Sequence, residues 1–171
     1  MKNIITTLFA AAALTVATSI GTADTVKLSE VHLCCKSCVK GVEKALSGAK
    51  GVTSDIDAKA GTVTLNGPEA DLKKALAALS KGGFSGQSNG KLKVPTAKAK
   101  AGKVKSAKIV GVHLCCGKCV KGVKTALSSV PGVSGDTVEN KAKSFEVTGD
   151  FEPQAVLSAL AKAGFNGRVA K

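Results

Sequence analysis

The chain has 171 residues, a formal net charge of +13 and neither Trp nor Tyr. A charge of this size attracts acidic surfaces. Without Trp or Tyr there is little on which bases could stack, so nucleic acid is the least favoured partner. An anionic envelope surface or an acidic protein fits the charge better, and the plainer alternative is that the lysines only keep a small protein soluble.

Residues 1–23 have the layout of a secretory signal peptide. Lys2 gives a positive start, an apolar run extends to about Ile20, and Gly21-Thr22-Ala23 supplies small residues for cleavage. The alternative is an uncleaved membrane anchor, but Thr and Ser interrupt the run, and a spanning helix needs about 20 predominantly apolar residues. We therefore expect an exported protein, periplasmic or extracellular, with no transmembrane segment after cleavage.

One segment of the sequence occurs twice. HLCCKSCVKGV begins at His32 and HLCCGKCVKGV begins at His113, and these two windows contain all six cysteines and both histidines of the chain. Further matches at the same spacing include Gly83-Phe84 with Gly164-Phe165. An internal repeat of this kind indicates a duplicated domain.

In chain order, the first copy begins with an alternating apolar segment at 26–31, which predicts a strand. The cysteine window follows as a loop. Val39, Val42 and Leu46 then recur at the spacing of one buried helix face. Segments 51–57 and 62–67 read as two strands joined by a short turn.

A second helix is expected after Pro68, because proline is favoured at a helix start. Its predicted buried residues are Leu72, Ala75, Leu76 and Leu79. A short last strand follows Phe84, and the second copy repeats the series from a strand at 107–112. The order β-α-β-β-α-β predicts an α+β protein made of two tandem ferredoxin-like domains.

These elements divide the chain into a signal peptide (1–23), a first domain with a cysteine window (24–88), a Lys-rich linker (89–106) and a second domain with a cysteine window (107–171). The linker has many like charges and little apolar pattern, so we expect it to be extended and mobile. Such a linker would either hold the two cysteine windows apart or let them face each other.

The cysteine windows have the spacing of a soft-metal site. Cys35 and Cys38, like Cys116 and Cys119, are three residues apart at a helix start, so their side chains lie on one face. The positive helix N-terminus, with Lys36 between the thiols, should lower the thiol pKa and favour the thiolate that binds metal. Thiolates select Cu(I) and Zn(II), and also Hg(II) or Cd(II) where these are present.

The additional residues of each window leave the ligand set open. Cys34 and Cys115 either complete a three-sulfur site or stand beside it. With His32, the three cysteines of the first window would form a closed Cys₃His set, which is typical of structural zinc. The alternative for His32 and His113 is a supporting role without metal contact.

The motif and the order of elements resemble the heavy-metal-associated domains of copper chaperones, metal-pumping ATPases and periplasmic mercury-binding proteins. The resemblance covers 26–88 and 107–171, and it implies the same fold and metal binding by the two Cys-x-x-Cys pairs. Leu33 stands where the family usually has Met, and His32 stands at the usual Gly. Cys34 occupies a position that often carries an extra ligand in zinc-handling members. By resemblance, Phe84 and Phe165 shield the metal site, although a core position is the simpler interpretation.

The sequence therefore predicts an exported metallochaperone or sequestering protein and not an enzyme, because neither a nucleophile–base pair nor a phosphate loop is present. A thiol–disulfide redox protein is one alternative, and a non-catalytic module that binds an acidic partner or an envelope surface is another. A disulfide scaffold is disfavoured, since a bridge within one loop would restrict the unfolded chain little. Docking to an acidic metal donor or acceptor is expected through lysines beside the two sites: Lys36, Lys40, Lys44, Lys118, Lys121 and Lys124.

Overall fold

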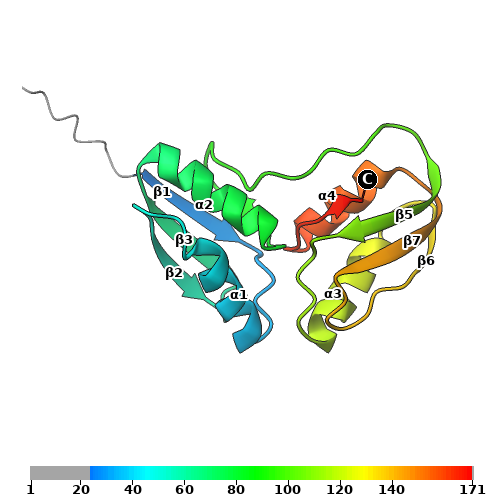
Figure 1. The fold of residues 1–171 in the computed structure, drawn as a ribbon, viewed down its shortest axis with the longest axis horizontal. Coiled ribbons are helices and arrows are strands. Elements are labelled where there is room, and N and C mark those ends of the chain that lie inside the picture. The colour runs from blue at the N-terminus through cyan, green and yellow to red at the C-terminus, as the bar shows by residue number, and fades with distance from the viewer. Residues whose placement is uncertain (1–23, 171) are drawn as a thin grey trace, which may run out of the picture.

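The computed structural model describes residues 24–170, which form two domains of the same architecture. Each domain is a four-stranded antiparallel sheet with two helices packed on it (Figure 1). The α+β ferredoxin-like prediction is confirmed in both copies. The predicted signal peptide lies outside the described residues. Within them, no helix is both long enough and apolar enough to span a bilayer.

The first domain contains six elements in the expected order. They are β1 (Asp24–Ser29), α1 (Lys36–Leu46), β2 (Thr53–Asp57), β3 (Thr62–Gly67), α2 (Glu69–Lys81) and β4 (Gln87–Ser88). The strands are arranged β2-β3-β1-β4. Helix α2 begins directly after Pro68, as the sequence predicts.

The second domain repeats this order. Its elements are β5 (Val104–Val110), α3 (Gly117–Ser128), β6 (Val133–Asp136), β7 (Ser144–Phe151), α4 (Pro153–Lys162) and β8 (Arg168–Val169). The strands are arranged β6-β7-β5-β8. Strand β5 begins at Val104, so it starts inside the segment 89–106 that was expected to be linker.

The core of each domain lies between the sheet and its two helices. Strands β1 and β3 alternate buried and exposed residues, so that one face of the sheet is apolar. Helix α2 covers this face with its four predicted residues, all at most 1% exposed: Leu72, Ala75, Leu76 and Leu79. Burying one such leucine stabilises the fold by about 1.5–3 kcal/mol. The predicted buried face of α1 is wrong at Val39, which is only partly buried. The buried residues of this helix are Cys38, Val42 and Leu46.

The linker between the domains is extended, as expected, but it is attached to both domains. The Pro95 carbonyl accepts hydrogen bonds from Ser80 Oγ (2.7 Å) and Asn166 Nδ2 (2.9 Å). Val94 beside it is buried. Further along, the backbone N–H of Ala99 donates to the Gln154 side chain at 2.8 Å. Polar side chains of both domains therefore bind the linker backbone.

The two domains meet where helices α2 and α4 end (Figure 1). Phe84 and Phe165 form an antiparallel β-bridge across the junction. Its two hydrogen bonds run from the Ser85 N–H to the Gly164 carbonyl (3.0 Å) and from the Asn166 N–H to the Gly83 carbonyl (2.9 Å). The bridge relates equivalent residues of the two copies, so the domains are paired about an approximate twofold axis.

Gly83 and Gly164 allow this close approach. Both have a left-handed backbone, with φ of 85° and 83°, which glycine adopts without steric cost. A Cβ on Gly83 would lie 2.5 Å from the His113 backbone nitrogen, and a Cβ on Gly164 would lie 2.5 Å from that of His32. The end of each domain's second helix is thus pressed against the start of the other domain's cysteine window.

Candidate metal centre

The two cysteine loops leave their sheets in the same way. The residue after the first strand has a left-handed backbone in both copies, with φ of 57° at Glu30 and 82° at Gly111. In the first domain, the Val31 N–H then donates to the Gly61 carbonyl at 2.9 Å, which fixes the start of the loop. Leu33 and Leu114, the residues at the family's usual Met position, are buried. Each loop is thereby anchored on its own core and directed toward the other domain.

The first family cysteine of each window caps a helix. Cys35 and Cys116 are the N-cap residues of α1 and α3 and have extended backbones. Their carbonyls accept the N–H groups of Cys38 and Cys119, both at 3.0 Å. Cys38 and Cys119 lie in the first turn and are 0% exposed. The helices therefore hold one cysteine at the tip and one within the buried face, next to each other.

All six cysteine sulfurs gather between the two domains. Within the first window, Cys38 Sγ lies 3.6 Å from Cys34 Sγ and 3.7 Å from Cys35 Sγ. Across the junction, the Cys38 and Cys119 sulfurs are 3.8 Å apart. Four further contacts of 3.4–3.6 Å cross the junction, namely Cys34 with Cys116, Cys34 with Cys119, Cys35 with Cys115, and Cys38 with Cys115. These contacts show that the two windows face each other. Because all six cysteines are free thiols, the windows together form one thiol-rich centre.

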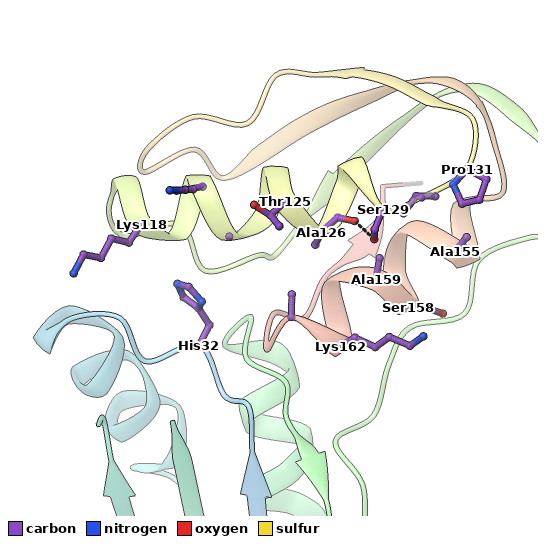
Figure 2. Close-up of a pocket in the computed structure, with 14 residues that line it drawn as sticks. His32, Lys118, Thr125, Ala126, Ser129, Pro131, Ala155, Ser158, Ala159 and Lys162 are labelled. Carbon is purple, nitrogen blue, oxygen red and sulfur yellow. Dashed lines mark hydrogen bonds between the residues drawn. The ribbon is translucent and has the colours of Figure 1, made fainter. Parts of the chain in front are cut away.

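Each histidine crosses to the opposite domain. The His32 ring lies 4.4 Å from the Phe165 ring, and the His113 ring lies 4.6 Å from the Phe84 ring. Figure 2 shows His32 leaving the first domain toward helix α3 of the second. One His32 nitrogen is within 4.8 Å of the Cys34 and Cys119 sulfurs. This set draws on both domains, whereas the Cys₃His set considered from the sequence drew on one.

The histidine Nε2 atoms are the only fully buried side-chain nitrogen or oxygen atoms of the described residues that lack a hydrogen-bond partner. Buried polar groups are nearly always satisfied. Burial also lowers the pKa of His113, which favours the neutral imidazole. Both features fit imidazoles placed beside a ligand-binding centre.

Two helix glycines make room for these rings. A Cβ on Gly41 in α1 would lie 2.8 Å from the Phe84 ring and 2.9 Å from His113 Cε1. A Cβ on Gly122 in α3 would lie 3.1 Å from both His32 Cε1 and the Phe165 ring. Glycine is unfavourable inside a helix by about 1 kcal/mol relative to alanine, and here it allows an aromatic ring and the other domain's histidine to pack on the helix.

The thiols differ in acidity because their surroundings differ. The backbone N–H of Cys38 at the helix start stabilises the Cys35 thiolate and is the main cause that lowers the pKa of Cys35 to about 6. This agrees with the expected effect of the helix start. Burial instead raises the pKa of Cys34 to about 12, and it also raises that of Cys115. At the central pair, the contact between the sulfurs lowers the pKa of Cys119 and raises that of Cys38, because the two thiols share a proton.

The lysines predicted to dock a partner are all exposed, and they lie on helices α1 and α3. Lys124 forms an ion pair with Asp136 at 2.8 Å. Lys118 and Lys121 line a groove between α3 and α4, together with His32 and Lys162 (Figure 2). The groove has small residues such as Ala126 and Ala159 at its walls. A basic surface thus borders the cysteine centre on the side of the second domain.

Comparison with known proteins gives one family for both domains. The model of the heavy-metal-associated domain matches residues 26–85 and 108–166. A copper-transporting ATPase 2 of Rhizobium meliloti (strain 1021) is 29% identical over 143 residues. That alignment covers 80% of this chain but only 15% of the ATPase, so the chain spans a small part of its relative's length.

Two solved structures with the same kind of domain are similar. The N-terminal domain of PacS from Synechocystis PCC6803 is 25% identical with a TM-score of 0.37, and the match covers 40% of this chain and 100% of that one. The N-terminal soluble domains of Bacillus subtilis CopA are 16% identical with a TM-score of 0.33, covering 88% of this chain and 96% of that one.

Proposed function

Because the chain belongs to the heavy-metal-associated domain family through both of its metal-binding domains, we propose that it carries or sequesters a soft metal ion, Cu(I) in preference to Zn(II). The observation that carries this proposal is the convergence of six free thiols at one centre. The chain acts as a binder and not as an enzyme. It releases the ion to a partner by ligand exchange.

Copper is preferred for two reasons. Thiolates are soft ligands and bind Cu(I) strongly, and a relative that aligns with most of this chain is named a copper-transporting ATPase. Zinc remains the competing cargo, since Cys-rich sites with a histidine also suit Zn(II). Hg(II) and Cd(II) would bind through the same sulfurs.

The test is an anaerobic titration of the reduced protein with Cu(I) and Zn(II) against competing chelators. Tight Cu(I) binding is expected, together with its loss when Cys35, Cys38, Cys116 and Cys119 are all changed to Ser. Ser37→Ala is the matched control, because Ser37 lies exposed in the same turn, and it should bind like the unaltered chain. If Cu(I), Zn(II), Hg(II) and Cd(II) all remain with the chelators, the carrier function is wrong.

The main rival is a thiol–disulfide exchange protein, and the lowered pKa of Cys35 suits a nucleophilic thiol as well as a ligand. The two functions separate experimentally. A redox protein would oxidise reversibly within the Cys-x-x-Cys pairs and reduce a disulfide substrate without metal. A metal carrier, once oxidised, would no longer compete with a chelator for the metal ion, and it would not reduce such a substrate.

Two further proposals concern the export of the chain and the docking of a partner. Residues 1–23 direct export and are then cleaved, which the N-terminal mass of the protein isolated from its source would test. An acidic donor or acceptor docks on the lysines beside the centre, two of which, Lys118 and Lys121, line the α3–α4 groove. Reversing their charge to Glu should slow metal transfer to an acidic acceptor, and unchanged transfer would contradict the docking.

A further inference from the structure

The sulfur–sulfur contacts at the centre close into triangles that share edges. In order, the triangles are Cys35/Cys38/Cys115, Cys38/Cys115/Cys119, Cys34/Cys38/Cys119 and Cys34/Cys116/Cys119. Every edge of these four triangles is 3.4–3.8 Å long, and each triangle contains residues of both domains. The six sulfurs therefore form a continuous strip across the junction and not two separate pairs.

The dimensions of each triangle suit one metal ion. Three sulfurs around an ion at the roughly 2.3 Å metal–sulfur distance known for zinc lie about 4.0 Å apart. The observed edges are slightly shorter, so binding requires only a small outward movement of each sulfur. Cu(I) accepts three thiolates in a plane, and a thiolate sulfur has enough lone pairs to bridge two or three such ions.

The central sulfurs are shared among several triangles. Cys38 and Cys119 each take part in three triangles, Cys34 and Cys115 in two, and Cys35 and Cys116 in one. The two central side chains are also 0% exposed. A buried thiolate is costly unless cations neutralise it, and sharing one sulfur among several Cu(I) ions provides that neutralisation.

We propose that the two domains together bind Cu(I) as one thiolate-bridged cluster of three or four ions, rather than one ion in each Cys-x-x-Cys pair. The proposal rests on the proposed function, since it specifies the cargo of the same centre. Each thiol that joins the cluster releases its proton to solvent and forms sulfur–copper bonds, with no change in oxidation state. The unpartnered Nε2 atoms of His32 and His113 are buried, and a nitrogen of His32 lies within 4.8 Å of two sulfurs of the strip.

The experiment is an anaerobic Cu(I) titration of the full chain, read by native mass spectrometry at partial loading and at the endpoint. A cluster predicts an endpoint of three or four ions. At partial loading it predicts metal-free and fully loaded protein with little of the one-ion form, because shared sulfurs make binding cooperative. Independent pairs predict an endpoint of two ions and abundant one-ion protein, and this result would overturn the proposal while leaving the carrier function intact. Absence of Cu(I) binding would overturn both.

A matched pair of substitutions provides the second arm. Cys35→Ser and Cys38→Ser each destroy the first Cys-x-x-Cys pair, so independent sites predict one remaining ion in both variants. The cluster predicts different losses, since Cys35 contributes to one triangle and Cys38 to three: two or three ions remain in the first variant and at most one in the second. Cys34→Ser, which leaves both pairs intact, should lower the capacity to two or fewer. Circular dichroism of each metal-free variant checks that it folds, and equal capacities in Cys35→Ser and Cys38→Ser would refute the bridged arrangement.

Discussion

Replacing Gly41 with Ala tests how tightly the opposite domain packs against helix α1. Alanine in a helix interior is favoured over glycine by about 0.8–1.0 kcal/mol. At this position, however, the new Cβ would lie 2.8 Å from Phe84 Cζ and 2.9 Å from His113 Cε1. Phe84 is only 2% exposed, so its ring has little room to move away.

The net change follows from these opposing terms. Overpacking a buried site costs about 1–3 kcal/mol, which exceeds the gain in helix propensity, so Gly41→Ala should destabilise the metal-free protein by about 0–2 kcal/mol. Gly122→Ala meets its neighbours at 3.1–3.2 Å and should be close to neutral. Gly117→Ala, at the start of α3 with nothing within 4 Å of its Cβ, should stabilise by up to about 1 kcal/mol.

Urea unfolding of the three reduced, metal-free variants gives the comparison. The expected order of stability is Gly117→Ala, then Gly122→Ala, then Gly41→Ala. In a His113→Ala background the penalty at Gly41 should shrink by at least about 0.5 kcal/mol, because one of the two crowding groups is gone. If Gly41→Ala instead stabilises the protein as much as Gly117→Ala does, the close packing of the two domains at this helix is refuted.

Three other predictions concern the junction, the thiols and the linker. Alanine at both Gly83 and Gly164 should separate the domains, because a Cβ there meets the backbone of the other domain, and the radius of gyration from small-angle scattering should rise; an unchanged radius would contradict the bridge. The pKa of the Cys35 thiol is lowered to about 6, so its reaction with iodoacetamide should slow only below about pH 6. The stability that its thiolate contributes to the fold should be fully present above the pKa of the unfolded chain and lost as the pH falls through 6. A reaction profile centred near the ordinary thiol pKa would argue against the helix-start effect. Asn166→Ala removes a hydrogen bond to the Pro95 carbonyl and should speed tryptic cleavage in the linker, with Ser37→Ala in helix α1 as a control that should not.

Much of each domain was predictable because its elements follow local rules. The spacing of Leu72, Leu76 and Leu79 predicts a helix packed on the sheet, and the structure confirms it. The pattern failed at Val39, since counting only aliphatic residues overlooked Cys38 as the member of the buried face. A cysteine at a helix start packs like a small apolar side chain, so its burial and its use as a ligand are not exclusive.

The pairing of the domains was not predictable from periodicity, which describes how a segment packs in its own domain. Two features of the sequence could have indicated the pairing, and both occur in each copy of the repeat. They are a glycine inside the first helix and a Gly-Phe pair after the second helix. The structure accounts for Gly41, because it places His113 against this position. A residue that weakens a helix in both copies of a repeat indicates that something outside the domain approaches at that point.

The linker that joins the domains also determines how the centre depends on protein concentration. Two separate single-domain proteins would have to collide to bring six thiols together, and their pairing would fall apart on dilution. Here the linker is bound to both domains at Pro95 and Ala99, so each half meets the other at an effective concentration of millimolar order, as short tethers provide. A chain present at trace levels therefore presents the same complete set of sulfurs as a concentrated one.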